Sequence, residues 1–213
     1  MIKESHIRHF SFSRTYPRLG KHRRTNRVQE ASRTAHFPGQ FVNADLTGKI
    51  PTTSIDGYDY ASLLVDRYSS YASILTGSSK TPEFVIQHIK SFQSELIRPI
   101  KTLRSDNGTE YINGTVSDFL KDSHIRHETT GTYRPDQNGK VERLSQTLFN
   151  TVRSMLNTCK LNDSFWSYAL RYAVYIYNRL PNNSNPDSLS PWEHQLKLQS
   201  RKRSRLNVPL KPL

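Results

Sequence analysis

The stretch LRSDNGTEY, residues 103–111, places an aspartate, an asparagine and a glycine directly behind the short apolar run IKTL at residues 100–103. An Asp-Asn-Gly sequence after such a run ends a strand sharply and exposes the aspartate side chain, although a simple turn has the same sequence. We interpret the run as a buried strand that ends in Asp106. A carboxylate in that position, in a chain with a formal net charge of +13, requires an explanation.

The hydrophobic pattern on both sides of this strand predicts further strands and helices. A Thr-Pro-Glu start and helical spacing predict a helix over 81–97, and Val141 begins a longer amphipathic helix. A last helix starts at a cap formed by Asn162 or Asp163 and runs through Leu180. This order predicts an α/β fold with helices on the faces of a mixed sheet. The other expected elements are a strand ending at 45, two strands within 60–77 that turn at 66–70, a helix at 116–123, a strand at 125–130 and a loop at 131–139.

The positive charge is concentrated at the two ends of the chain. Residues 1–36 contribute +7 and residues 197–213 contribute +6, whereas acidic and basic residues balance between them. Basic arms release counterions when they bind nucleic acid, but they can equally be solvated tails. The neutral core favours a polyanionic partner. We divide the chain into a basic arm or linker at 1–36, a core at 37–196 and a basic tail at 197–213.

The remaining composition excludes several classes of protein. No run approaches the ~18 apolar residues of a membrane span, and the first residues lack the apolar stretch of a signal peptide. Cys159 is the single cysteine, which excludes an intrachain disulfide and a cysteine-rich zinc module. The sequence therefore predicts a soluble intracellular protein without a membrane partner.

Three acidic residues stand out by their positions. Asp45 ends the first predicted strand, Asp106 ends the central one, and Glu142 lies in the first turn of the long helix. Strand ends and helix starts at one edge of a sheet are where α/β folds assemble a site. Each residue alone has an ordinary structural explanation, as a turn former, a strand breaker or a favourable charge at a helix N-terminus.

Three carboxylates brought together repel one another, which raises the pKa of at least one unless a cation is present. Oxygen ligands in small number, with positions left for water and phosphate, suit Mg²⁺ or Mn²⁺ better than zinc. Two such ions can activate an attacking oxygen and stabilise the leaving one in a displacement at phosphorus. The sequence therefore predicts that Asp45, Asp106 and Glu142 hold Mg²⁺ or Mn²⁺, as two ions.

The pieces LRSDNGTEY, TYRPDQNGKVERLSQTL and DSFWSYALRYAVYIYNRLP, in this order, resemble the catalytic core of retroviral-type integrases, most closely those of copia-type LTR retrotransposons. The resemblance runs from about Leu19 to about Gln195. That family carries the acids Asp, Asp and Glu with thirty-five residues between the last two, the spacing between Asp106 and Glu142 here. The resemblance implies an RNase H-like fold with a five-stranded mixed sheet flanked by helices.

The resemblance also implies a function. The chain would be a DNA integrase, a metal-dependent polynucleotidyl transferase with endonuclease activity, which removes nucleotides from the 3′ end of element DNA and transfers the new 3′-hydroxyl to target DNA. It would act as a homo-multimer beside other products of a retroelement polyprotein, in the nucleus after assembly of a cytoplasmic particle. RKRSR at 201–205 could be a nuclear-import signal or only a basic tail.

Residue matching extends the candidate site beyond the acids. In the family, the loop before the catalytic helix touches DNA ends, and residues on the first turns of that helix could reach phosphates or base edges or form a solvated helix face. Tyr133 could stack on a base or pack beneath the loop. His127 matches a histidine common in the family, whereas Asp66, before a hairpin turn, is interpreted as structural. The predicted DNA-binding residues are Tyr133, Gln137, Asn138, Lys140, Arg143 and Gln146.

Two features depart from the family. Its upstream His/Cys zinc module ends in paired cysteines, but this chain has Arg14 and Pro17 at those places, so we expect residues 1–36 not to bind zinc. Nothing after Gln195 resembles the family's long C-terminal region, which suggests a fragment or a decayed copy. A DDE transposase or RNase H-type nuclease, and an inactive DNA-binding remnant, therefore remain alternatives.

Overall fold

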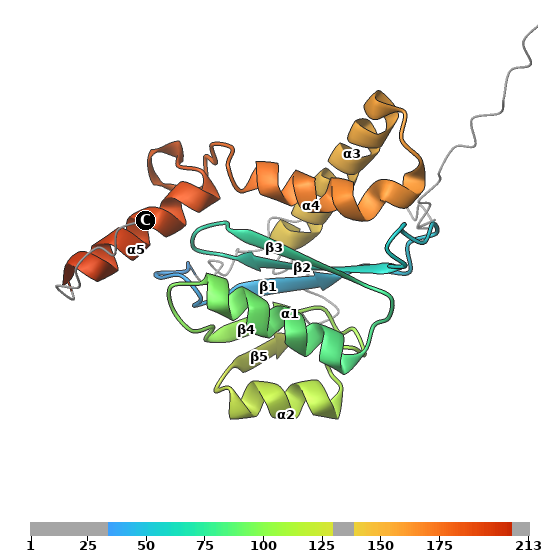
Figure 1. The fold of residues 1–213 in the computed structure, drawn as a ribbon. Coiled ribbons are helices and arrows are strands. Elements are labelled where there is room, and N and C mark those ends of the chain that lie inside the picture. Colours follow the sequence, from blue (N-terminus) through green and yellow to red (C-terminus); the bar gives the residue numbers. More distant parts are fainter. Residues whose placement is uncertain (1–33, 130–138, 206–213) are drawn as a thin grey trace, which may run out of the picture. The chain divides into compact units, whose positions relative to one another are not determined.

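The core of the protein is a five-stranded sheet in the spatial order β3-β2-β1-β4-β5 (Figure 1). A computed structural model describes residues 34–129 and 139–205. The predicted order of strands and helices is confirmed, and of the predicted loop only Gly139 is described, as the first residue of a helix. The strands are β1 (Val42–Leu46), β2 (Tyr60–Asp66), β3 (Ala72–Gly77), β4 (Thr102–Ser105) and β5 (Arg126–Thr129). The helices are α1 (Pro82–Glu95), α2 (Gly114–Asp122), α3 (Gly139–Cys159), α4 (Trp166–Tyr177) and α5 (Pro191–Arg205), with short 3₁₀ turns at Asp163–Phe165 and Pro186–Ser188.

The sheet is mixed, as expected, because its connections are of two kinds. The strands β1, β2 and β3 pair antiparallel in sequence order. By contrast, β4 pairs parallel with both β1 and β5. Parallel neighbours need a crossover connection, and the helices α1 and α2 lie in the segments that lead to β4 and to β5.

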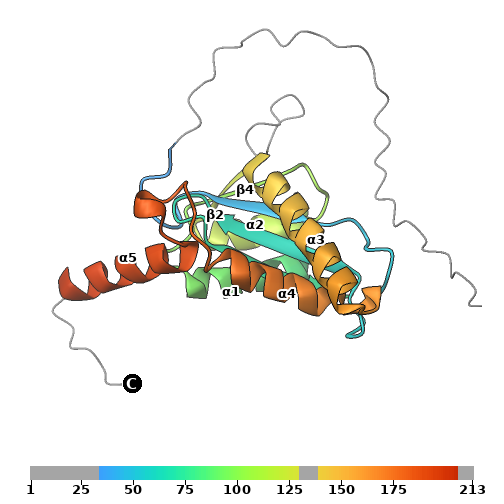
Figure 2. The same ribbon diagram turned by 90° about the horizontal axis from the view of Figure 1, so that it is seen from above.

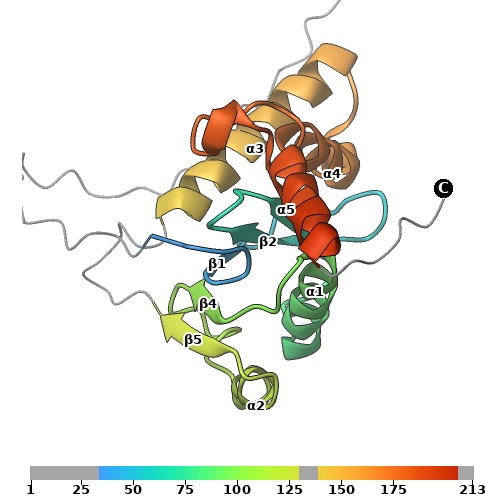
Figure 3. The same ribbon diagram turned by 90° about the vertical axis from the view of Figure 1, so that its left-hand side faces the viewer.

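Each face of the sheet packs against a different pair of helices. Successive residues of a strand point to opposite faces. In β1, Val42 and Ala44 therefore join the core formed with α1 and α2. In β2, Leu63 and Val65 join the second core, formed with α3 and α4. Figures 1 and 3 show these two helical layers on either side of the strands, and Figure 2 shows α3 and α4 side by side.

Local sequence explains where α1 begins. Thr81 caps the helix by accepting a hydrogen bond from the backbone N–H of Phe84, at 3.3 Å between Oγ1 and N. Pro82 follows at the first helical position, where a missing N–H costs nothing. Phe84, Ile89 and Phe92 then bury the apolar side of the helix against the sheet.

The helix α4 is shorter than predicted. Its last residue is Tyr177, and Leu180, expected on its buried face, is 56% exposed. The helix ends here because Asn178 forms hydrogen bonds outside it. Its side-chain amide donates to the Ala72 carbonyl in β3 at 2.7 Å and accepts from the Ala72 backbone N–H at 2.9 Å. Its backbone carbonyl accepts from the backbone N–H of Trp192. These contacts hold residue 178 against the sheet edge.

The helix α5 was not predicted. It begins with a capping box in which Ser190 and Glu193 bond reciprocally: the Ser190 backbone N–H and hydroxyl donate to Glu193 Oε2, and the Glu193 backbone N–H donates to Ser190 Oγ.

None of the helices within the two described ranges combines the length and the apolar character that a membrane span requires.

Candidate active site

The strands β1 and β4 carry the two predicted aspartates to one edge of the sheet. Their parallel register sets Val42 opposite Leu103, and its continuation beyond the paired residues sets Asp106 opposite Asp45. Val42 and Leu103 both belong to the core on the α1 face. Since side chains alternate along a strand, Asp45 and Asp106 belong to the opposite face, where α3 packs.

The Asp-Asn-Gly turn orients Asp106, which is exposed directly behind β4. Asp106 Oδ1 accepts a hydrogen bond from the backbone N–H of Gly108 at 3.1 Å. The preceding residue, Ser105, donates its hydroxyl hydrogen to the backbone carbonyl of Asp106 at 2.8 Å. The same hydroxyl oxygen lies 2.9 Å from His127 Nε2. With the hydroxyl proton used in this way, the imidazole N–H of His127 donates to Ser105. His127 thus supports the turn from the neighbouring strand, and burial lowers its pKa.

A buried phenol lies close to the acidic residues. Tyr111 is fully buried in the core on the α1 face. Burial raises the pKa of its hydroxyl far above the usual range; the negative charge of Asp45 raises it further, Ser62 opposes the shift, and Asp106 and Glu110 add smaller effects. The charges of both strand-end carboxylates therefore act on this one hydroxyl. Tyr111 was not among the predicted site residues, although it follows Asp106 by only five residues in the sequence.

Glu142 lies on α3, the helix that packs on the same face of the sheet. Its neighbours Val141 and Leu144 are buried against the sheet, and the same face continues through Leu148 and Val152. Glu142 itself is exposed in the first turn of the helix. The structure thus places all three predicted acids on the α3 side of the sheet.

The predicted DNA-binding residues divide into three groups. Arg143 and Gln146 are exposed on α3, as a DNA contact requires. Lys140 is half-buried and donates a hydrogen bond to Ser70 Oγ in the β2–β3 turn, with 2.9 Å between the two atoms. Three further residues lie outside the described residues, and their predicted roles stay predictions: Tyr133, Gln137 and Asn138.

Positive charge gathers near the start of α3. The pKa of Lys140 is lowered by burial and by Arg67, while Asp66 acts in the opposite direction. The pKa of Arg67 is lowered by burial and by Arg104. Arg104, on β4, pairs with Glu128 at 2.8 Å between Nε and Oε2. Arg67 and Arg104 were not predicted as site residues, because their partners become neighbours only in the folded sheet.

The carboxylates suit a hard divalent cation in their chemistry, since Asp45 and Asp106 offer oxygen ligands from adjacent strands. Across the described ranges 34–129 and 139–205, however, no three acidic, histidine or cysteine side chains lie close enough together to enclose a metal ion. The aspartate pair thus fits as a partial ligand set. Glu142 is on the same side of the sheet but does not close the set in this conformation.

Asp66 has the structural role that its position before a turn predicts. Its fully buried carboxylate accepts hydrogen bonds from the backbone N–H of Gly39 (2.9 Å) and from the backbone N–H and hydroxyl of Ser69 (2.8 and 2.6 Å). Burial raises the pKa of this carboxyl, against the effect of these donors. Asp66 is therefore a turn residue of the β2–β3 connection.

The aromatic residues of α4 divide between the core and the surface. Trp166 is buried, and its indole N–H donates to the Thr52 carbonyl at 2.8 Å. Tyr172 and Tyr175 are exposed and stack on each other, with ring centroids 6.0 Å apart. Beside them, a shallow groove of about 320 Å³ lies between β3 and α4, with Ile74, Tyr175 and Trp192 among its lining residues.

Known structures share this arrangement of sheet and helices. A chain of the simian T-cell lymphotropic virus intasome, solved in complex with the PP2A regulatory subunit B56 gamma, aligns with a TM-score of 0.63 and 22% identity over 76% of this chain and 56% of that one. The HTLV-2 integrase catalytic core, solved with magnesium in trimeric and dimeric forms, aligns with TM-scores of 0.58 and 0.57 over 75% of this chain and 98% of the core. The fold is therefore the RNase H-like fold of retroviral integrase cores.

Sequence comparisons identify the family. Residues 35–135 match the family model of the integrase core domain. The Retrovirus-related Pol polyprotein from transposon TNT 1-94 of Nicotiana tabacum is 36% identical over 66% of this chain, and that from transposon RE2 of Arabidopsis thaliana is 29% identical over 70%. The chain spans about a tenth of the length of these relatives (11% and 10%). Residues 35–135 thus match an integrase core domain, and the resemblance to retroviral-type integrases that the motifs predict is confirmed.

Proposed function

We propose that this chain is the catalytic core of a retroelement integrase, which processes the 3′ ends of element DNA and joins them to target DNA. The observation that supports this function is the shared register of Asp45 and Asp106 at the ends of two parallel strands, on the face where α3 presents Glu142. Carboxylates so placed suit phosphoryl transfer, in which positioning and charge stabilisation supply most of the catalysis.

We propose Mg²⁺ or Mn²⁺ as the cofactor, bound as two ions by Asp45, Asp106 and Glu142. Bound at these oxygens, such ions activate an attacking oxygen and stabilise a leaving one at phosphorus. The similar HTLV-2 core was solved with magnesium. The chain's own contribution is positional: the Gly108 amide fixes the Asp106 carboxylate, and the buried face of α3 holds Glu142 on the same side of the sheet.

The proposed partners are DNA, other products of the retroelement polyprotein and further copies of this chain. The basic ends, at +7 and +6, supply charge for phosphate binding. The exposed aromatic surface of α4 supplies an interface between copies, because Tyr172 and Tyr175 present apolar rings to solvent. Action on host DNA requires entry into the nucleus, for which RKRSR at 201–205 is the proposed signal.

The function is tested by strand joining. Purified protein with Mn²⁺ should join an oligonucleotide that carries a 3′-hydroxyl to plasmid DNA. Asp106→Asn keeps the size and the turn but removes a charged metal ligand, so joining should fall by at least about 10²-fold while DNA binding persists. The control is Asp118→Asn, which changes an exposed aspartate of α2 on the other face of the sheet and should leave joining unchanged.

Other outcomes separate the alternatives. Joining that survives Asp106→Asn excludes this site as the catalyst. Cleavage of an RNA/DNA hybrid in preference to a DNA end identifies a nuclease. Salt-sensitive DNA binding with no divalent-ion-dependent turnover in the unmutated protein identifies a DNA-binding remnant.

A further inference from the structure

The β2–β3 turn, residues 66–70, forms a buried corner of the molecule that is held by hydrogen bonds. Ser69 and Ser70 are buried to 0% and 1% exposure, which is unusual for turn residues. Ser70 has a φ of 63°, in the left-handed region, and Asp66 fixes the turn through the three hydrogen bonds described above. A corner held in this way can serve as a rigid anchor for other segments.

Two buried side-chain amides pack onto this corner, Asn185 from the segment between α4 and α5 and Gln195 from α5. Asn185 Nδ2 donates to the Ser69 carbonyl at 2.9 Å and to the Leu189 carbonyl at 3.0 Å. Gln195 Nε2 donates to Ser69 Oγ at 3.0 Å. Asn185 and Gln195 are 5% and 3% exposed, so these bonds are shielded from water.

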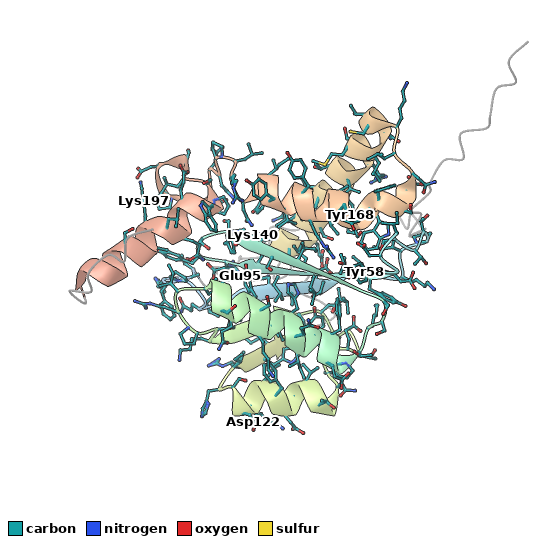
Figure 4. The ribbon with its side chains drawn as sticks, in the orientation of Figure 1. Tyr58, Glu95, Asp122, Lys140, Tyr168 and Lys197 are labelled. Atoms are coloured by element: carbon teal, nitrogen blue, oxygen red, sulfur yellow. The ribbon has the colours of Figure 1, made fainter. Side chains whose placement is uncertain are left out.

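Lys140 reaches the same corner from α3. Its ammonium donates to Ser70 Oγ at 2.9 Å, and the Ser70 hydroxyl in turn lies 3.4 Å from Asn185 Oδ1. A hydroxyl can accept one hydrogen bond while it donates another. Ser70 therefore links the amide of Asn185 to the first turn of α3. Figure 4 shows Lys140 beside the strands, on the face of the sheet that carries α3 and α4.

A lysine in the first turn of a helix is electrostatically unfavourable, because the helix dipole is positive there. The same ammonium is also half-buried and close to Arg67. Its hydrogen bond to Ser70 offsets this placement in the folded protein. By contrast, Arg143 lies on the exposed side of the helix and is free to meet a phosphate.

We propose that Lys140 is a positioning residue, which ties the start of α3 to the β2–β3 turn through Ser70 and so fixes the orientation of Glu142. One residue, the buried Val141, separates Lys140 from Glu142, so a restraint on Lys140 restrains the carboxylate. The segment that contains Asn185 belongs to the same restraint. This inference rests on the proposed function in that it takes Glu142 as a metal ligand.

Two variants of the full chain test the proposal. Lys140→Met removes the ammonium but keeps an unbranched apolar stem. Ser70→Gly removes the hydroxyl and suits the backbone, because glycine adopts positive φ without strain. Each should lower the maximal joining rate at saturating DNA by about tenfold, with little change in the DNA concentration for half-maximal rate. The double variant should be no slower than Ser70→Gly alone, because Ser70→Gly already removes the acceptor of the Lys140 hydrogen bond.

The salt dependence of DNA binding separates positioning from DNA contact. If Lys140 bound a phosphate, Lys140→Met would reduce the slope of log K against log salt by about 1. If Lys140 acts by positioning, the slope of log K against log salt should be the same in Lys140→Met as in the unmutated chain. A reduced slope, together with full joining activity in Ser70→Gly, would overturn the proposal. Lys121→Met, at an exposed lysine of α2, is the matched control and should change neither the slope nor the rate.

A third measurement does not depend on activity. The amides of residues 143–146 bond to the carbonyls of the first turn of α3, so loosening that turn speeds their hydrogen exchange. Exchange should be faster in Ser70→Gly than in the unmutated chain, and equal exchange contradicts the restraint. If the unmutated chain joins no DNA, the proposed function fails, yet this exchange comparison still decides whether the tie to Ser70 exists.

Discussion

The position of the Asp106 carboxylate depends on Gly108, the residue two positions later, which has no side chain. The Gly108 amide donates to its carboxylate, and a Cβ added at Gly108 would lie 3.0 Å from Asp106 Oδ1 and 2.8 Å from the carboxyl carbon of Glu110. The 2.8 Å contact requires the Glu110 side chain to move, and the 3.0 Å contact requires the Asp106 carboxylate to shift as well. At the residue scale, the glycine of the Asp-Asn-Gly turn thus acts on the site as well as on the backbone.

Gly108→Ala should therefore impair the site without unfolding the protein. Displacement of Asp106 by a fraction of an ångström to an ångström should lower the strand-joining rate by about 10- to 100-fold and weaken Mn²⁺ binding. The measurements are single-turnover joining and Mn²⁺ titration. Gly114→Ala is the matched control, since a Cβ at Gly114 meets no atom within 4 Å. Full joining activity in Gly108→Ala would show that Asp106 needs no such space.

At the scale of elements, the packing of α1 on β2 buries an ionisable side chain. His88 of α1 is 1% exposed, and its Nδ1 lies 2.8 Å from Ser62 Oγ of β2. Burial lowers the pKa of His88 from 6.5 to about 3. The imidazole is therefore neutral in the folded protein and protonates more readily in the unfolded chain.

The sign of the resulting pH dependence follows from this depressed pKa. The contribution of His88 to stability is complete above pH 6.5 and is lost as the pH falls towards about 3. Between pH 7 and pH 5 the burial of His88 should therefore lower the free energy of unfolding by about 2 kcal/mol. This figure follows from about 1.4 kcal/mol for each pH unit below the pKa of histidine in the unfolded chain. Urea unfolding at both pH values measures it. His88→Gln should lose less stability over this interval, and an equal loss in both proteins would contradict the burial of a neutral imidazole.

Elements with a local signal were predictable, and those held by distant contacts were not. The turn at Asp66 and the cap at Thr81 follow from neighbouring residues. The predicted end of α4 was wrong because Asn178 forms hydrogen bonds with Ala72 of β3, which is 106 residues away in the sequence. The helix α5 lacks an apolar period, yet Ser190 and Glu193 have the spacing of a capping box, which would have located its start.

The candidate site shows the same division. Asp45, Asp106 and Glu142 were predicted from their positions at strand ends and at a helix start, and the family resemblance added the spacing between the last two; their role as a site stays a prediction. The contact of Lys140 with Ser70 joins residues 70 positions apart and depends on the path of the chain through the sheet. The charge of Lys140 at the start of a helix does not reveal this contact, and its predicted role in DNA binding stays a prediction.

In the molecule as a whole, helices cover both faces of the sheet, whereas residues 34–129 and 139–205 leave the outer side of α4 exposed. Tyr168, Tyr172 and Tyr175 are all at least half exposed there (50%, 57% and 51%). Arg179 lies over the Tyr175 ring, 3.5 Å from its centroid. Aromatic residues combined with arginine are typical of the centres of protein interfaces. This surface therefore supports the proposed assembly of several copies.

Tyr172→Glu should weaken that assembly, because it places a charge at the centre of the apolar surface and removes the ring that stacks on Tyr175. Sedimentation velocity of the full chain should show a multimer that shifts to smaller species in the variant, with a dissociation constant raised by at least about tenfold. Ile112→Glu is the matched control, because Ile112 is 56% exposed in the segment before α2, away from α4. If Ile112→Glu dissociates the multimer and Tyr172→Glu does not, the copies meet through another surface, and the rings of α4 have a different role.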